Sequence, residues 1–225
     1  MKSLKRLKTI VLESDMNKRS VEAVGAAEYL ADVITNPNST NMTSSSAAGE
    51  FSDEAVSILY HLHMSQTGLK ALFGRNGEFI EALTRTMQRT DNDESRTYAV
   101  LLLKSMMEVV EPVQVMVKTV EAGAVPVLVD IATRQYRKRI IEMVLMLLHQ
   151  LCLCADGRAE LLKHGAGLAV VSKKIFRVSA VASERAVRIL HSIAKFSAMQ
   201  VFYKRCCSWE WWETMLSVAG RLLWE

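Results

Sequence analysis

The chain has 225 residues, of which half are hydrophobic and only three are proline. This length is enough to bury a core, and the dominant Leu, Ala, Val, Met, Glu, Lys and Arg favour a helical protein over a sheet protein or a disordered chain. The formal net charge of +4 is mild and the densest basic run, Lys2 to Lys8, is short, which argues against a nucleic-acid partner. The longest apolar run, Met143 to Leu148, is far too short to span a membrane.

The four cysteines occur as one CxC pair and one CC pair, which is not the spacing of zinc ligands: Cys152, Cys154, Cys206 and Cys207. The N-terminus is charged, unlike that of a secretory signal. A reducing compartment is therefore expected, and we predict a cytoplasmic location, with the nucleus as an additional one. No metal and no cofactor is expected.

Five long helices are predicted in chain order, and each contains a leucine followed by two mostly polar residues and an apolar one. They cover Lys2–Leu12, Ser52–Met64, Glu94–Val110, Tyr136–Cys152 and Ser183–Phe196. The repeated leucines are Leu7, Leu59, Leu103, Leu148 and Leu190, at spacings of 52, 44, 45 and 42 residues. Apolar residues at i, i+4 and i+7 indicate one buried face on three of these helices: Ala55, Leu59 and Leu62; Ala99, Leu103 and Met106; and Ala186, Leu190 and Ile193.

A second series of positions runs between these helices: Gly25, Gly77, Gly123 and Gly165, each followed by an apolar helical segment. Glycine suits a sharp turn between helices because it adopts a left-handed conformation at little cost. Pro126 fits the first turn of such a segment. Ser52 and Ser183 are predicted as helix N-caps, and Asp91 and Asp93 as part of an N-cap region.

The first interval in both series is long because residues 36–49 are rich in Ser, Thr and Asn and have no apolar periodicity, so they are predicted to form a flexible insert. Without that insert the period is that of armadillo or HEAT repeats, about 40–47 residues. The sequence therefore predicts an all-α, armadillo-type right-handed superhelical solenoid of about five repeats, incomplete at both ends. Residues 1–203 form the array and residues 204–225 an atypical C-terminal tail.

The residues around the third glycine, from Val120 to Asp130, resemble the armadillo signature. The stretches Leu4–Lys8, Asn17–Arg19, Ala23–Ala26 and Glu184–Leu190 resemble, more specifically, plant U-box proteins with armadillo repeats. The resemblance covers residues 1 to about 203.

In that family a U-box recruits a ubiquitin-charged conjugating enzyme and the armadillo array holds the substrate. The resemblance implies that this chain recognises protein substrates for an E3 ubiquitin ligase, in defence or stress signalling. The Cys-Pro-Ile and Asp-Pro-Val segments of a U-box have no counterpart here, so the chain alone is expected neither to bind the conjugating enzyme nor to transfer ubiquitin. The alternative is a stand-alone armadillo scaffold or adaptor without ligase activity.

By analogy with the family, the long helices line a concave groove that holds the protein substrate. Two sets of corresponding positions in the repeats are therefore candidates for that groove: Thr9, His61, Ser105, Gln150 and Ser192, and one turn earlier Lys5, Ser57, Leu101, Met146 and Arg188. Polar groups there would bind an extended peptide backbone, with Leu101 and Met146 as pockets for side chains. The competing interpretation, that these side chains are solvated or locally packed, is as well supported. The Asn and Trp ladders of importin-type arrays are absent, so binding of nuclear signals is not expected.

No catalytic residue is predicted, because no catalytic or nucleotide-binding motif is present. His61 and His63 point to different sides of a helix, which suits a metal poorly. His149 and Cys152 can share a face, but packing or capping is favoured over a metal site. Cys152 and Cys154 are predicted to be buried thiols.

Overall fold

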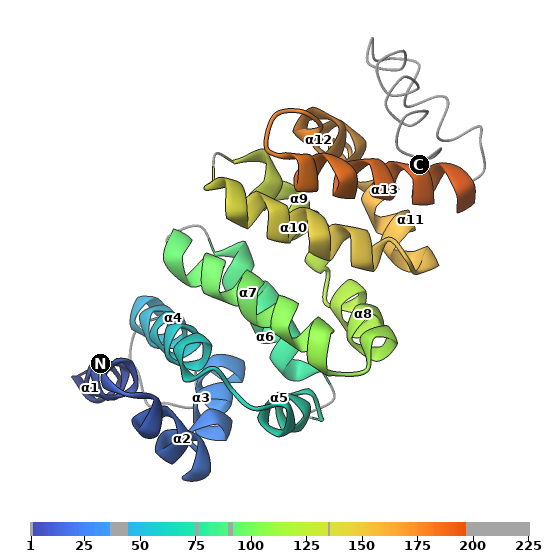
Figure 1. The fold of residues 1–225 in the computed structure, drawn as a ribbon. Coiled ribbons are helices and arrows are strands. Elements are labelled where there is room, and N and C mark those ends of the chain that lie inside the picture. The colour runs from blue at the N-terminus through green and yellow to red at the C-terminus, as the bar shows by residue number, and fades with distance from the viewer. Residues whose placement is uncertain (1, 37–44, 75–76, 90–91, 135, 197–225) are drawn as a thin grey trace. The chain divides into compact units, whose positions relative to one another are not determined.

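The computed structural model describes residues 2–36, 45–74, 77–89, 92–134 and 136–196 (Figure 1). These residues form thirteen helices and no strand. The helices fall into two compact units, residues 1–127 and residues 128–225, and the division lies within α9, between Val127 and Leu128. None of the described helices is both long and apolar enough to cross a membrane.

A single long helix, α1 (Lys2–Glu13), is followed by four groups of two shorter helices and one longer helix. The groups are α2 (Asp15–Ala23), α3 (Ala26–Thr35) and α4 (Ser45–Leu62); α5 (Gln66–Phe73), α6 (Glu78–Gln88) and α7 (Asp93–Val109); α8 (Pro112–Glu121), α9 (Ala124–Thr133) and α10 (Lys138–Leu151); α11 (Ala155–Lys163), α12 (Gly167–Lys174) and α13 (Ala180–Phe196). The predicted all-α class and repeat length are confirmed by this order.

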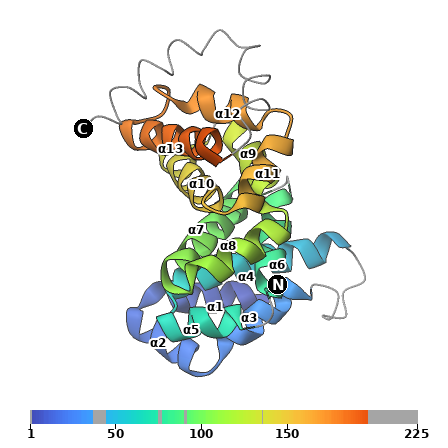
Figure 2. The same ribbon diagram turned by 90° about the vertical axis from the view of Figure 1, so that its right-hand side faces the viewer.

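In the first unit the long helices α1, α4 and α7 lie side by side, and α3 and α6 pack behind α4 and α7 (Figures 1 and 2). The repeated leucines explain this layer, because Leu59 and Leu103 are completely buried. Their partners at helical spacing are buried with them: Ala55, Leu62, Ala99 and Met106. The predicted apolar faces of α4 and α7 are confirmed.

In the second unit α13 lies against both α10 and α12 (Figure 2). The repeated Leu148 and Leu190 are again in the core, together with Ala186 and Ile193. Each unit therefore buries one apolar stripe of every long helix and leaves the opposite stripe outside.

Three of the four predicted glycine turns are confirmed. Gly25, Gly77 and Gly123 have φ angles of 79°, 84° and 73°, the left-handed region that favours glycine. Gly165 does not have a positive φ, so the fourth turn is built differently. There α12 begins at Gly167, after a turn in which the backbone N–H of Ala166 donates to His164 Nδ1 at 3.3 Å.

The predicted N-caps at Ser52 and Ser183 are wrong, because α4 and α13 begin earlier than expected. Ser52 is buried within α4, whose first residue is Ser45. Ser179 caps α13 by accepting from the N–H of Ala182, and the Ser183 hydroxyl accepts from the N–H of Phe176. The N-cap of α7 is Asn92, which accepts from the N–H groups of the first turn.

The early start of α4 also shortens the predicted insert at 36–49. Asn36 caps the C-terminus of α3, and residues 45–49 are helical. Residues 37–44 and the predicted tail, 204–225, lie outside the described residues.

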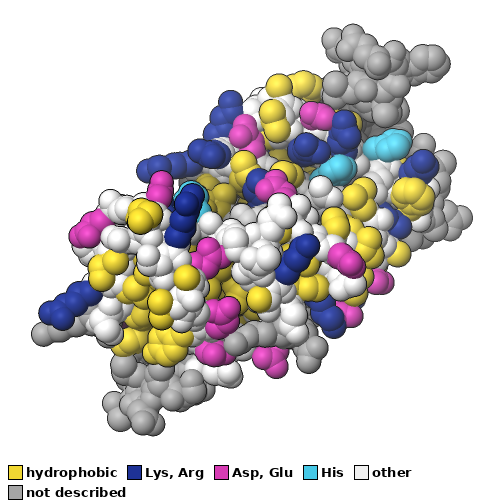
Figure 3. Space-filling view, turned by 60° about the horizontal axis from the view of Figure 1, so that its bottom comes forward, with side chains coloured by type: hydrophobic (Ala, Val, Ile, Leu, Met, Phe, Trp, Pro, Cys, Tyr) yellow, Lys and Arg dark blue, Asp and Glu magenta, His cyan; other side chains and the backbone are white. Residues whose placement is uncertain are grey.

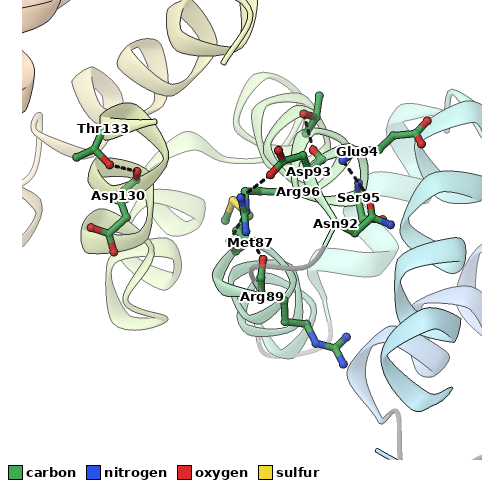
Figure 4. Close-up of polar contacts among 10 residues, drawn as sticks. Met87, Arg89, Asn92, Asp93, Glu94, Ser95, Arg96, Asp130 and Thr133 are labelled. Carbon is green, nitrogen blue, oxygen red and sulfur yellow. Dashed lines mark hydrogen bonds and ion pairs between the residues drawn. The ribbon is translucent and has the colours of Figure 1, made fainter. Parts of the chain in front are cut away.

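A buried arginine ties the end of α6 to the start of α7 (Figure 4). Arg96 is only 2% exposed, and its guanidinium donates to the carbonyl of Met87 at 3.0 Å and to that of Arg89. It also pairs with Asp93 at 2.8 Å. These carbonyls belong to the last turn and C-cap of α6 and have no partner inside that helix, so Arg96 replaces the missing donors. In Figure 4 Thr133 similarly donates to the carbonyl of Asp130 within α9.

Candidate functional site

The outward stripes of the long helices carry the candidate site, and each unit presents its own. We use "aromatic face" for the outward side chains of α1, α4 and α7 in the first unit: Lys8, Glu54, Tyr60, His61, Tyr98 and Leu101. We use "basic face" for those of α10 and α13 in the second unit: Lys138, Arg139, Met146, Gln150, Arg185 and Arg188. All of these side chains except Arg139, Lys138 and Arg188 are half-buried.

On the aromatic face an ion pair joins α1 to α4. Lys8 Nζ lies 3.6 Å from Glu54 Oε1, and the two side chains are 25% and 21% exposed. An ion pair that remains accessible to water contributes little to stability, and salt screens it. It nevertheless links two successive repeats at the surface.

A cluster of rings joins α4 to α7. The rings of Tyr60 and Tyr98 stack with centroids 4.8 Å apart, and the His61 ring meets Tyr98 edge-on at 5.2 Å. Aromatic pairs in these arrangements are favoured beyond the area that they bury. The three rings form an aromatic platform at the surface of the first unit.

Two pKa shifts describe the chemistry of this platform. Burial, reinforced by the hydrogen bond to Glu94, raises the pKa of Tyr98 to about 12. The Tyr98 hydroxyl donates to Glu94 Oε1 at 2.7 Å. Burial also lowers the pKa of His61, and the nearby Lys8 and His63 add to the effect. Both rings are therefore neutral at pH 7, so the platform can offer apolar surface and hydrogen-bonding groups to a ligand.

Three pairs of neighbouring long helices, α1 with α4, α4 with α7 and α10 with α13, interact through the same two positions of the repeat. Lys8, Tyr60 and His149 each directly follow a repeated leucine, and Glu54, Tyr98 and Arg185 each stand five residues before the next one. Lys8 pairs with Glu54, Tyr60 stacks on Tyr98, and Arg185 acts electrostatically on His149. The same two positions of the repeat thus hold an ion pair, a pair of stacked rings and an arginine near a histidine. In this way a repeated backbone can present a surface that does not repeat.

The predicted site residues of the first unit are divided between surface and core. Lys5 and Thr9 are exposed on α1, and His61 belongs to the ring cluster. Leu101 is half-buried beside Ser105, whose hydroxyl donates to the Leu101 carbonyl at 3.0 Å. Ser57 is only 3% exposed, and within the described residues its hydroxyl has no hydrogen-bond partner.

In the second unit the predicted Met146 and Gln150 are half-buried on α10, and Arg188 is exposed on α13. Ser192 is only 7% exposed, and its hydroxyl donates to the Cys152 carbonyl at 2.9 Å. Since Ser57 and Ser192 are buried, they contribute to packing between helices and we leave them out of the proposed surfaces. Their burial differs from the prediction because these two side chains point further toward the core than the alignment of the repeats with one another suggested.

Sequence reasoning missed the ring pair Tyr60–Tyr98. The signal was present, because Tyr60 directly follows a repeated leucine and Tyr98 stands five residues before the next. Their contact depends on how far one helix is shifted along its neighbour, and the repeat spacing alone does not give that shift.

The cysteines do not form a reactive or metal-binding centre in the described residues. Cys152 is buried, as predicted, and burial raises the pKa of its thiol to about 12. Cys154 is instead half-buried at the N-cap of α11, where its sulfur accepts from the N–H of Gly157. No group of three or more His, Cys, Asp or Glu side chains in the described part of the chain is placed to hold a metal ion.

A cavity of about 480 Å³ lies elsewhere in the first unit, between α5 and α8. It is open, and apolar side chains such as Phe73, Val113 and Val117 contribute to its lining. Lys118 at its edge pairs with Glu121 at 2.8 Å. The cavity lacks the convergent polar groups of a specific ligand site. Figure 3 shows a face on which hydrophobic side chains are interspersed with charged ones.

Comparison with known proteins places this arrangement among armadillo repeats. The family model "Plant U-box protein ARM repeat region" matches residues 1–119 and 107–218, which reaches beyond residue 203, where the resemblance was expected to end. The chain is 38% identical over 243 residues to the E3 ubiquitin-protein ligase PUB23 of Arabidopsis thaliana, covering 88% of this chain and 57% of PUB23. It is 36% identical over 264 residues to the E3 ubiquitin-protein ligase PUB22 of Arabidopsis thaliana, covering 88% of this chain and 60% of PUB22. The chain thus spans less than two thirds of the length of these relatives.

Among solved structures, the fold is similar to that of a designed armadillo repeat protein in complex with the peptide (KR)4. The TM-score is 0.58 at 15% sequence identity, and the match covers 98% of this chain and 91% of the designed protein. At this identity the likeness shows the armadillo fold alone.

Proposed function

Because the chain belongs to the armadillo repeat family of plant U-box proteins, we propose that it is the substrate-recognition region of a plant E3 ubiquitin ligase. In this proposal the aromatic face holds a segment of the protein substrate. Ubiquitin transfer itself would require a U-box and a charged conjugating enzyme, whose binding motifs these 225 residues do not contain. A role in defence or stress signalling is part of the same proposal.

The observation that carries the proposal is the ring platform of Tyr60, His61 and Tyr98. Tyrosine is enriched where proteins bind proteins, because its ring buries a large area at low entropic cost and its hydroxyl remains satisfied. Here the half-buried Leu101 extends the apolar surface by one turn from Tyr98 along α7. Lys5 and Thr9 on α1 add exposed polar groups to the same unit, which suits an extended peptide.

The complex of the designed armadillo protein with (KR)4 supports the idea that the fold can hold a peptide. It does not show which peptide sequence this chain would bind, because the side chains on the binding face, and not the shared backbone fold, determine that preference. On the proposed face of the first unit the rings and Leu101 supply apolar surface, and Lys8 and Glu54 pair with each other. The segment that it holds would therefore present apolar side chains.

A chimaera tests the proposal. The matched 57% of PUB23 would be replaced by this chain, and ubiquitin-modified proteins would be compared in cells that make the chimaera or the chimaera with Tyr98→Ala. We expect a set of modified proteins that disappears with Tyr98→Ala, while self-modification by the chimaera is unchanged. If the shortened PUB23 without any replacement modifies the same proteins, the proposal is wrong. If the chimaera modifies only itself, the adaptor alternative is supported instead.

A further inference from the structure

The charge of this chain is divided unevenly between its two units. Residues 128–196 contain twelve Lys and Arg against five Asp and Glu, a net charge of +7. Residues 1–127 contain thirteen against sixteen, a net charge of −3. The mild total of +4 conceals this contrast. A protein surface with one sign of charge attracts and orients ligands of the other sign.

Part of the excess lies on the basic face, where α10 and α13 lie side by side (Figure 1). Arg188 is paired with Glu184 at 2.8 Å, yet its side chain is still 57% exposed. Arg185 is half-buried and pairs with no carboxylate in the described part of the chain. Lys138 and Arg139 are exposed in the first turn of α10.

The pKa of the neighbouring His149 is affected by the positive charges of this face. Burial lowers its pKa first, and Arg185 and Arg188 lower it further, while Glu184 opposes them. The imidazole is therefore neutral at pH 7 and cannot compensate a ligand's charge by itself. Met146 and Gln150 are half-buried on the same helix, α10. Met146 supplies apolar surface and Gln150 supplies an amide.

We infer that the basic face binds an acidic segment of a protein, in which Asp or Glu side chains pair with Arg185 and Arg188 and an apolar side chain covers Met146. Arginine suits this task because its planar guanidinium can bind a carboxylate with two parallel hydrogen bonds. This inference rests on the proposed function in one respect only: it takes the acidic segment to be part of a substrate protein. It is the opposite preference to that of a protein that binds (KR)4.

A peptide fits this face better than a nucleic acid does. Single-stranded nucleic acids need free aromatic rings on which bases stack. The basic face contains no aromatic side chain, and the ring at the end of α13, Phe196, which is 61% exposed, already has the Arg158 guanidinium over it at 4.7 Å and Lys195 at 5.3 Å.

Fluorescence anisotropy on the full 225-residue chain tests the inference, with dye-labelled (Glu-Asp)4 and (Lys-Arg)4 peptides as probes. The acidic peptide should bind and the basic peptide should not, and the affinity should fall as salt is raised. The double variant Arg185→Gln/Arg188→Gln should weaken binding at least about fivefold. The control, Lys163→Gln/Lys173→Gln, removes the same charge from exposed positions of α11 and α12 and should change affinity less than about twofold.

Equal weakening by both double variants would overturn the inference, because it would show a response to net charge and not to a site. Displacement of (Glu-Asp)4 by a lower concentration of single-stranded oligothymidine would overturn it too, in favour of a nucleic-acid surface. This assay involves no ubiquitin. A failure here therefore leaves the chimaera result standing, and a failed chimaera leaves acidic-peptide binding intact.

Discussion

The rings of Tyr60 in α4 and Tyr98 in α7 stack with their centroids 4.8 Å apart, although the two residues lie in different repeats. The pair therefore connects two helices that are joined in the chain only through α5 and α6. Such a contact stabilises the packing of repeats and at the same time forms a surface for a ligand.

A double-mutant cycle measures the coupling of this pair. We expect Tyr60→Ala and Tyr98→Ala each to lower the free energy of unfolding, and the double variant to cost less than their sum by about 0.5–1.5 kcal/mol. Urea denaturation of the four proteins gives the value. A coupling energy within error of zero would mean that the stacked geometry contributes nothing to stability.

Arg96 provides a second prediction. Arg96→Met roughly keeps the volume of the side chain but leaves the carbonyls of Met87 and Arg89 without their donors, which we expect to cost about 2–4 kcal/mol. The control is Lys104→Met, because Lys104 forms an ion pair with Glu108 on the surface of the same helix, at 2.6 Å. An exposed pair of this kind contributes only about 0.3–0.5 kcal/mol. Equal destabilisation by the two variants would show that the buried network is not needed.

Ser192 and Ser105 occupy corresponding positions but have different partners, which gives a third prediction. Ser192→Ala removes a buried hydrogen bond across 40 residues of sequence, so the free energy of unfolding should fall by about 1–2 kcal/mol. Ser105→Ala removes only a bond to its own helix, which competes with the helix ladder, and should change stability by less than about 0.5 kcal/mol. Chemical denaturation of both variants makes the comparison, and the reverse order would contradict the assignment of Ser192 to the core.

Tyr98 makes a prediction about alkaline pH. Its pKa is raised to about 12, above the usual value of 10.0, so the folded state favours the neutral phenol. The resulting stabilisation is fully present below pH 10 and is lost as the pH rises through 12. The difference in ultraviolet absorbance between the wild type and Tyr98→Phe isolates this titration.

Glu94→Gln should lower the Tyr98 pKa but leave it above 10.0, because burial is the largest cause of the shift and the hydrogen bond to Glu94 only the second. A Tyr98 pKa of 10 in the wild-type chain would show that the ring is exposed.

Much of the fold could be predicted from the spacing of Leu59, Leu103, Leu148 and Leu190, because a buried stripe every 42 to 45 residues determines both the helices and their stacking. Helix starts were less predictable. Ser52 resembled an N-cap, but α4 continues seven residues further toward the N-terminus. The exposure of the candidate site residues was hard to predict for a related reason. His61 and Leu101 lie at the surface, while Ser57 and Ser192, which occupy corresponding positions in other repeats, are buried. Small rotations of each helix decide which residue points outward, and a repeat pattern does not contain them.

The central claim is that the aromatic face of the first unit is where a partner protein binds. Its most direct test is photo-cross-linking in plant cells, with benzoylphenylalanine placed at Leu101 on this face or at Val113 on α8, where the side chain is 67% exposed. We predict that Leu101 captures a discrete set of proteins that Val113 does not capture and that Tyr60→Ala releases. Capture of the same proteins from both positions, or capture at Leu101 that is unaffected by Tyr60→Ala, would contradict the claim.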